Sequence, residues 1–188
     1  MVSLQTPLCN FGWKAPDFNL PGVDHKRYRL QELAGPQGLL VMFICNHCPY
    51  VKAVRSRIVR DAADLMPHGI RCVAINANDA TQYPEDNFEH MQIIARAWSL
   101  PFPYLHDVDQ SVAKAYGAVC TPDFFGFNKD LELQYRGRLD ASRKETAADA
   151  SRDLYQAMLQ IAQTGQGPKD QIPGIGCSIK WKEEHSVS

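Results

Sequence analysis

The chain has 188 residues, a length that suits one globular domain with a full core, and we expect a single domain over 1–188. Hydrophobic residues make up 45% and charged residues 22% of the sequence, a balance that excludes extended disorder. The formal net charge of −1 excludes a strongly basic surface, so we expect no nucleic-acid partner.

The N-terminal segment has neither the basic start nor the apolar run of a secretory signal. The longest apolar run, 39–45, is too short to cross a bilayer, so we expect no membrane partner. These features predict a cytoplasmic protein. Its six cysteines should be mostly free thiols, because the cytosol reduces structural disulfides, and a dithiol that does oxidise there is more often catalytic.

The first half of the chain alternates strand and helix patterns. Residues 17–30 predict an N-terminal β-hairpin, and the continuous apolar run 38–45 predicts a strand buried on both faces. Apolar residues recur at helical spacing over 51–65, which predicts a helix. A second buried strand is predicted at 70–78, and a second helix at 83–100.

Shorter elements follow. Residues 102–107 predict a strand, and Asp107 with Gln110 forms a capping-box pattern that opens a short helix at 110–118. Residues 122–139 predict a second β-hairpin.

The last helix is predicted from a second capping-box pair, Ser142 and Glu145. An irregular tail is expected from about residue 165. The order of the elements predicts an α/β fold. The residues of the last helix that should face inward are Ala150, Leu154, Met158 and Ile161.

Cys45 and Cys48 form a C-x-x-C pair directly after the first buried strand. Such a pair can be a reversible dithiol, half of a metal site, or two small buried residues. We expect Cys45 to lie where the strand ends and the helix begins. Unpaired N–H groups and the helix dipole stabilise a thiolate there, so the pKa of Cys45 should be lowered. Cys48, one turn later, is close enough to form a disulfide with it.

His47 lies between the two cysteines and, when protonated, favours the thiolate and hence the reduced form. We therefore predict a redox potential above that of thioredoxin, about −270 mV, and toward the oxidising limit of about −120 mV. A solvated turn residue is the alternative interpretation of His47. Among the other cysteines, Cys72 is expected to be a small buried hydrophobe and Cys9 to be incidental.

Several motifs follow one another along nearly the whole chain: APDFNL, CNHCPY, AYGAVCTPDFF, YRGRLD and IGCSIKW. Their order resembles the thioredoxin-like superfamily, and most closely its alkyl hydroperoxide reductase/thiol-specific antioxidant (redoxin) branch. The closing motif is similar to the tail of a group of small bacterial redoxins. The resemblance implies a thioredoxin-like fold, with a central mixed β-sheet flanked by helices.

The resemblance also implies roles for particular residues. Cys45 would be the attacking thiol and Cys48 the resolving one, with His47 tuning the pair. Pro122 would be a cis-proline packed against the dithiol, whereas its position alone also fits a loop proline. Thr121 would offer backbone groups to an incoming disulfide or peptide.

The sequence departs from the superfamily in two informative ways. Ile44 replaces the tryptophan that precedes the first cysteine of thioredoxin, and the strand leading to the pair carries no carboxylate. The peroxiredoxin motif Pro-x-x-x-Thr-x-x-Cys fits neither cysteine, since counting back from Cys48 gives Cys45 and Val41. A thiol–disulfide oxidoreductase is therefore favoured over a peroxidase.

Three functions stay open at this stage. The first is disulfide exchange with a protein or small-molecule disulfide, the second is peroxide reduction by the same pair, and the third is metal binding. Both enzymatic functions need a reducing thiol system as electron donor and no cofactor. A metal-binding module would use Cys45, Cys48, Cys120 and His47. Cys120 and Cys177 are also candidate accessory thiols, with packed free cysteines as the alternative.

Overall fold

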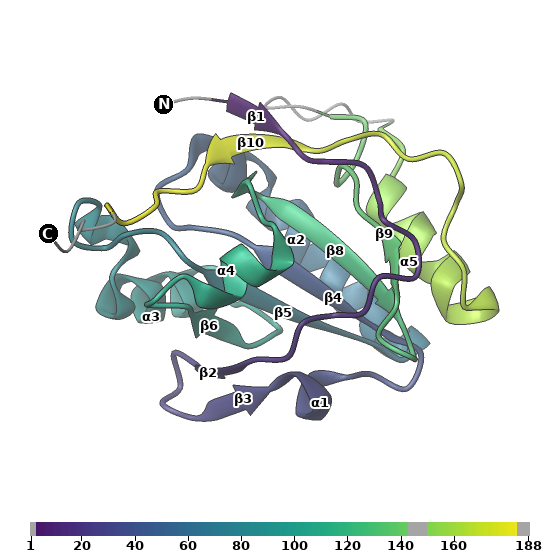
Figure 1. The fold of residues 1–188 in the computed structure, drawn as a ribbon, viewed down its shortest axis with the longest axis horizontal. Helices are drawn as coiled ribbons and strands as arrows, with labels where there is room; N and C mark the ends of the chain where they lie inside the picture. Colours follow the sequence, from purple (N-terminus) through teal and green to yellow (C-terminus); the bar gives the residue numbers. More distant parts are fainter. Residues whose placement is uncertain (1–2, 143–149, 184–188) are drawn as a thin grey trace, which may run out of the picture.

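The computed structural model describes residues 3–142 and 150–183, and a mixed sheet of five strands forms its centre (Figure 1). Strands β4, β5 and β6 run parallel to one another, whereas β8 runs antiparallel to both of its neighbours, β4 and β9. In spatial order the strands are β6 (Tyr104–His106), β5 (Ile70–Asn76), β4 (Gly38–Phe43), β8 (Asp123–Asn128) and β9 (Leu133–Tyr135).

The central strand β4 is buried along its whole length, as the continuous apolar run predicts. Successive side chains alternate between the two faces of the sheet. Leu40 and Met42 join one hydrophobic cluster, whereas Leu39, Val41 and Phe43 join the other.

Helices cover both faces of the sheet. The larger helices α2 (Pro49–Leu65), α3 (Phe88–Ala97) and α5 (Asp153–Thr164) supply side chains to the cluster that contains Met42. The short helices α1 (Leu30–Leu33) and α4 (Ser111–Tyr116) supply side chains to the opposite cluster.

The predicted inward faces are confirmed for two helices. All the residues of α2 that were predicted to face inward are buried. Three of the four residues predicted for α5 are also buried, whereas Ala150 precedes that helix and is half-buried. The buried α2 residues are Val51, Val54, Ile58, Ala62 and Leu65, and those of α5 are Leu154, Met158 and Ile161.

The predicted N-terminal hairpin is present as the antiparallel pair β2 (Asn19–Pro21) and β3 (Arg27–Arg29). The fold class is likewise confirmed as α/β, with a central mixed sheet flanked by helices.

The second helix begins later than predicted. Pro84–Asp86 forms a separate 3-10 turn, and α3 starts only at Phe88. The Asn87 side chain caps α3 by accepting a hydrogen bond from the His90 N–H at 2.8 Å. Because of this break, the Asp86 side chain points into the protein interior instead of lying on the surface of a helix.

The predicted capping box at Asp107 and Gln110 is wrong in its details. The Asp107 carboxylate accepts hydrogen bonds from the N–H groups of Val112 and Ala113, inside the first turn of α4. Gln110 adopts a left-handed backbone (φ 64°), and its amide donates to the Ala77 and Lys180 carbonyl oxygens. The second predicted box cannot be compared, because Glu145 lies outside the described residues.

The prediction of an irregular tail is wrong for Ile175–Ser178, which form strand β10. This strand lies between β1 (Ser3–Gln5) and β7 (Cys120–Thr121) in a separate antiparallel sheet (Figure 1). The chain ends are therefore tied to the segment that precedes Pro122. None of the helices in 3–142 and 150–183 is long and apolar enough to span a membrane.

A buried ion pair anchors the β7–β8 junction, and its loss should destabilise the protein. The Asp123 carboxylate is 0% exposed and accepts a hydrogen bond from Arg136 Nη2 at 2.9 Å. Asp123→Ala leaves the buried guanidinium without its counter-charge, so we expect a loss of about 3–5 kcal/mol in the free energy of unfolding. Urea unfolding followed by circular dichroism measures this loss.

The matched control is Lys14→Ala, which removes a solvent-exposed ion pair with Glu132. This variant should lose less than about 1 kcal/mol. Equal losses in the two variants would contradict an anchoring role for the buried pair.

Candidate active site

The C-x-x-C pair lies in the loop between β4 and α2. Strand β4 ends at Phe43 and α2 begins at Pro49, so Cys48 is the N-cap residue. Proline fixes this start, because it needs no N–H in the first turn and disfavours helical backbone at the residue before it. The prediction that Cys45 lies at the start of the helix is therefore wrong, and Cys48 occupies that position.

Thr121 contacts both sulfur atoms. Its hydroxyl oxygen lies 3.2 Å from Cys45 Sγ, and its carbonyl oxygen lies 3.2 Å from Cys48 Sγ. The peptide bond between Thr121 and Pro122 is cis, as the resemblance implies. The structure thus brings both predicted substrate-binding residues to the dithiol. Cys45 is 1% exposed and Cys48 0% exposed, so both thiols are closed off from solvent.

The surroundings of Cys48 stabilise a thiolate. Several hydrogen bonds together lower the pKa of Cys48 to about 4, against the opposing effect of burial, and the largest contribution comes from the Cys45 thiol. The Cys177 thiol and the backbone N–H groups of Val51 and Cys177 make smaller contributions to this lowering. The Thr121 carbonyl oxygen favours the protonated form, but it is a single acceptor facing several donors. We therefore assign the thiolate to Cys48.

Cys45 has the opposite preference. Burial raises its pKa well above the usual value, and the hydrogen bond to Cys48 and the negative charge of Asp86 raise it further. The expectation of a lowered pKa at Cys45 is wrong, because this residue precedes the helix and donates to Cys48 instead of accepting from a helix N-terminus.

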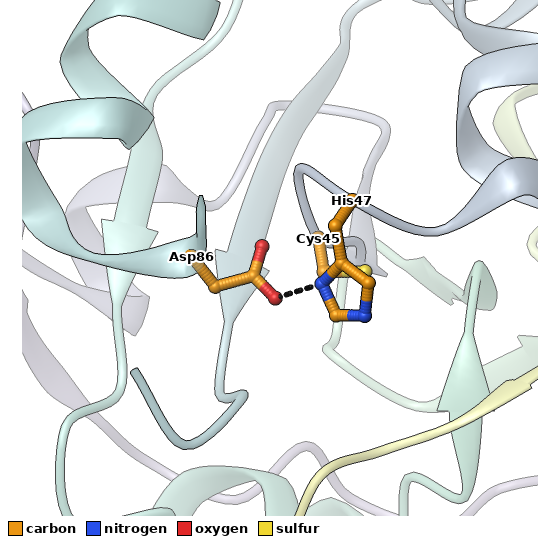
Figure 2. Close-up of side chains that lie close together, drawn as sticks. All are labelled: Cys45, His47 and Asp86. Carbon is orange, nitrogen blue, oxygen red and sulfur yellow. Dashed lines mark hydrogen bonds and ion pairs between the residues drawn. The ribbon is translucent and has the colours of Figure 1, made fainter. Parts of the chain in front are cut away.

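His47 points from the same loop toward Asp86, and Figure 2 shows the two side chains meeting next to Cys45. The distance from His47 Nδ1 to Asp86 Oδ2 is 2.5 Å. This hydrogen bond raises the pKa of His47, whose ring also stacks on Tyr83 with centroids 5.2 Å apart. The imidazolium form is thereby favoured, and the tuning role of His47 stays a prediction.

Asp86 is the functional residue that sequence reasoning missed. Its carboxylate is fully buried and accepts hydrogen bonds from the Asn46 backbone N–H and the Asn78 side-chain amide, both at 2.7 Å. Burial raises its pKa, but the hydrogen bonds from His47, Asn78 and Asn46 outweigh burial, so the pKa is lowered. The strand before the dithiol carries no carboxylate, and Asp86 supplies one from the 3-10 turn.

The two candidate accessory thiols have different positions. The Cys177 thiol donates a hydrogen bond to the Cys48 sulfur, whereas the Cys120 thiol faces the Pro122 carbonyl oxygen at 3.6 Å. Burial raises the pKa of both. The structure therefore brings Cys177, and not Cys120, into contact with the predicted pair. Cys72 is buried in β5, as predicted.

One group of potential metal ligands is found among the described residues. Cys45 Sγ, a ring nitrogen of His47 and a carboxylate oxygen of Asp86 all lie within 4.8 Å of one another. Sulfur, imidazole and carboxylate donors suit Zn²⁺. A metal there would displace the hydrogen bond between His47 and Asp86, and Cys120 would not be a ligand. The donor set therefore differs from the one expected from the sequence.

A cavity of about 570 Å³ opens beside the dithiol. Its wall includes Tyr50 and Val54 of α2, Phe124 of β8, and Pro122, which directly precedes β8. None of the cysteines lines it. The cavity therefore reaches the residues that flank the pair, while the sulfur atoms stay behind them.

The pKa of Cys48 predicts the pH range in which the thiolate exists. Titration of the reduced protein, followed by thiolate absorbance at 240 nm, should show one step near pH 4 that is absent in Cys48→Ser. Cys45→Ala removes the largest donor and should raise the midpoint. Because the folded-state pKa lies below the unfolded value of about 8.5, this thiolate stabilises the reduced fold at high pH, and that contribution is lost as pH falls toward 4.

Cys72→Ser is the matched control for this titration, since Cys72 is a buried thiol away from the pair. The acidic step should be unchanged in this variant. A step that persists in Cys48→Ser and disappears in Cys45→Ser would contradict the assignment of the thiolate to Cys48.

The contact between His47 and Asp86 predicts a second titration. Asp86→Asn removes the negative charge, so the pKa of His47, measured by NMR of its ring protons, should fall. Since this pKa is raised in the folded state, the imidazolium stabilises the fold fully below pH ~6.5, and this contribution is lost as pH rises through the folded-state value. The variant should lose that pH dependence.

Asp64→Asn serves as the control, because Asp64 lies at the other end of α2 and pairs with Arg152. The pKa of His47 should not respond to it. An equal effect of both variants would rule out a specific action of Asp86.

Comparisons with known proteins agree with this fold. The model of the AhpC/TSA family matches residues 11–136. An uncharacterized conserved protein from Geobacillus kaustophilus is 46% identical, with a TM-score of 0.92 over 98% of both chains. A hypothetical protein from Sinorhizobium meliloti is 39% identical, with a TM-score of 0.91 over 96% of this chain and 99% of its own. No curated protein matches the chain.

A more distant structure supports the fold alone. The thioredoxin domain of a thiol-disulfide oxidoreductase from Bacteroides vulgatus is 12% identical, with a TM-score of 0.63 over 81% of this chain and 97% of its own. The family match supports a thiol-based redox role. Because that match covers most of the chain and the fold is thioredoxin-like, the chain belongs to the AhpC/TSA family, the redoxin branch of the thioredoxin-like superfamily.

Proposed function

We propose that the protein is a thiol–disulfide oxidoreductase in which Cys48 attacks the oxidised substrate and Cys45 resolves the product. The observation that carries this proposal is the position of Cys48 at the N-cap of α2, where the backbone of the helix and the neighbouring thiols of Cys45 and Cys177 favour a thiolate. The thiolate is the nucleophile in thiol–disulfide exchange. This order of attack reverses the one that the resemblance implies.

With a disulfide substrate, the exchange takes two steps. The Cys48 thiolate attacks one substrate sulfur, so that a mixed disulfide forms and the other substrate sulfur leaves as a thiolate. Cys45 then attacks Cys48 Sγ, which forms the Cys45–Cys48 disulfide and releases the second substrate thiolate. The proton of Cys45 ends on the departing sulfur. A reducing thiol system restores the dithiol.

His47 and Asp86 adjust the charge around this chemistry. The imidazolium of His47 lies beside the pair and attracts negative sulfur, while Asp86 holds the ring in place through Nδ1. A thiolate that is stabilised at Cys48 favours the reduced form and makes the disulfide a stronger oxidant. This supports the expectation of a potential above that of thioredoxin.

Peroxide reduction is a second candidate, favoured by the burial of both sulfur atoms. A small peroxide needs a narrower opening than a protein disulfide to reach a thiolate that is 0% exposed. The Cys48 thiolate would attack one peroxide oxygen, forming sulfenic acid while the other oxygen leaves as alcohol or water. Cys45 would then condense with the sulfenic acid, and water would leave.

Single-turnover oxidation tests the proposal and separates the two substrates. Reduced protein is mixed with a stoichiometric small disulfide or with hydrogen peroxide, and both oxidant loss and the Cys45–Cys48 link are followed. Cys48→Ser should lose the fast phase, at least about 100-fold in rate, because it lacks the nucleophile. Cys45→Ser should keep the first step.

Cys72→Ser should react like the wild-type protein. A fast phase with the disulfide alone supports exchange, and a fast phase with peroxide alone supports the second candidate. Wild-type rates in Cys48→Ser, or an oxidised protein without a link between residues 45 and 48, would overturn the proposal.

A further inference from the structure

Strand β10 occupies the backbone edge where the resemblance implies that a substrate peptide would dock. Cys177 lies opposite Thr121 and Ser178 opposite Cys120 in the antiparallel register of β10 and β7. A peptide that binds a sheet edge adds a strand in this way. Here a segment of the same chain, more than fifty residues later in the sequence, fills that edge (Figure 1).

Gly176 allows this strand to approach the Thr121–Pro122 peptide closely. A Cβ atom at position 176 would lie 2.3 Å from the Thr121 carbonyl oxygen and 2.6 Å from its carbonyl carbon. Such distances are far below van der Waals contact, so only glycine fits without moving the strand. The same carbonyl oxygen lies 3.2 Å from Cys48 Sγ. The glycine therefore sets how near β10 comes to the dithiol.

The register directs the Cys177 side chain at the active site. Residues directly opposite in a β-ladder place their side chains on the same face of the sheet. Since the Thr121 hydroxyl lies 3.2 Å from Cys45 Sγ, that face is the one that carries the dithiol. The Cys177 thiol accordingly donates a hydrogen bond to the Cys48 sulfur. Cys48 thus lies between two thiols, Cys45 and Cys177.

We propose that Cys177 is a third catalytic thiol, carried on β10 as an internal substrate strand, and that it forms a disulfide with Cys48 in alternation with the Cys45–Cys48 disulfide. This proposal rests on the proposed function, because it needs an oxidised Cys48. It goes further because it names Cys177 as the thiol that replaces Cys45 in the disulfide with Cys48.

The step between the two disulfides is an exchange without net oxidation. Cys177 loses its proton and attacks Cys48 Sγ, the Cys48–Cys177 bond forms, and the Cys45–Cys48 bond breaks. Cys45 leaves as a thiolate and takes up the proton that Cys177 gave up. Cys177 can also attack Cys48 Sγ while Cys48 is still in a mixed disulfide with the substrate. The bond to the substrate sulfur then breaks, and the substrate thiolate leaves and takes up the proton of Cys177.

The position of β10 suggests how this exchange would help an external thiol to reduce the protein. Cys177 is 4% exposed, against 0% for Cys48, and its neighbour Ile175 is 37% exposed. Moving the disulfide onto β10 places it on a strand that reaches the surface two residues away, at Ile175, and this is the side from which a reducing thiol would approach the Cys177 sulfur. Cys120 does not offer this route, because it is 0% exposed and its thiol faces the Pro122 carbonyl oxygen.

Peptide mapping after stoichiometric oxidation tests the proposal. The full-length protein is oxidised with one equivalent of a small disulfide, free thiols are alkylated, and the digest is analysed without reduction. Cys45→Ser should yield the Cys48–Cys177 link in most molecules. The double variant Cys45→Ser with Cys177→Ser should lose this link and accumulate the mixed disulfide on Cys48.

Two further variants serve as controls. Cys45→Ser with Cys120→Ser should still form the Cys48–Cys177 link. Cys45→Ser with Gly176→Val should form it at least about 10-fold more slowly, because the valine displaces β10. If Cys45→Ser accumulates only the mixed disulfide while Cys177 is alkylated as a free thiol, the proposal is overturned. The wild-type Cys45–Cys48 link is measured in parallel, and only its absence counts against the proposed function.

Discussion

Burying a negatively charged sulfur atom is the constraint on which the rest of the site depends. A charge removed from water costs several kcal/mol unless donors surround it. At Cys48 these donors come from Cys45 in the preceding loop, from the backbone of α2, and from Cys177 on β10. Cys45 and the backbone of Val51 lie three residues from Cys48 in the sequence, whereas Cys177 lies more than a hundred residues away, so the full set of donors exists only after the fold has brought β10 to the pair. The proposed thiolate thus depends on tertiary structure and not on the C-x-x-C motif alone.

Strand β10 is consequently part of the candidate active site. It supplies both a thiol and an N–H group to Cys48, and Gly176 lets it pack against the Thr121–Pro122 peptide. A strand in this position closes the edge that an extended peptide would use, so substrates must approach from elsewhere. The cavity lined by Tyr50 and Pro122 reaches residues that flank the pair. Closure of the edge and burial of the sulfurs both favour small oxidants over folded protein disulfides.

Much of this arrangement could be predicted from local patterns. The burial of β4 on both faces and the inward face of α2 follow from residues that are close in sequence, whereas the place of the Thr121–Pro122 segment beside the pair follows from the resemblance. The positions of Asp86 and β10 could not be predicted from local sequence patterns. An acidic residue after Pro84 ordinarily begins a helix and faces solvent, and only the 3-10 turn and the Asn87 cap direct it inward. Ile175–Ser178 is too short and glycine-rich to give a strand pattern, and its pairing with β7 depends on long-range register.

The same long-range contacts couple the redox state to protonation. In the reduced protein, His47 lies near two anions, the Asp86 carboxylate and the Cys48 thiolate, and both raise its pKa. Oxidation removes the thiolate charge when Cys48 enters a disulfide, and His47 keeps only Asp86 as a counter-charge. The pKa of His47 must therefore be lower in the oxidised state than in the reduced state. By linkage, a protonated His47 favours reduction, so between those two pKa values acidification raises the redox potential more steeply than proton uptake by the two cysteines alone would.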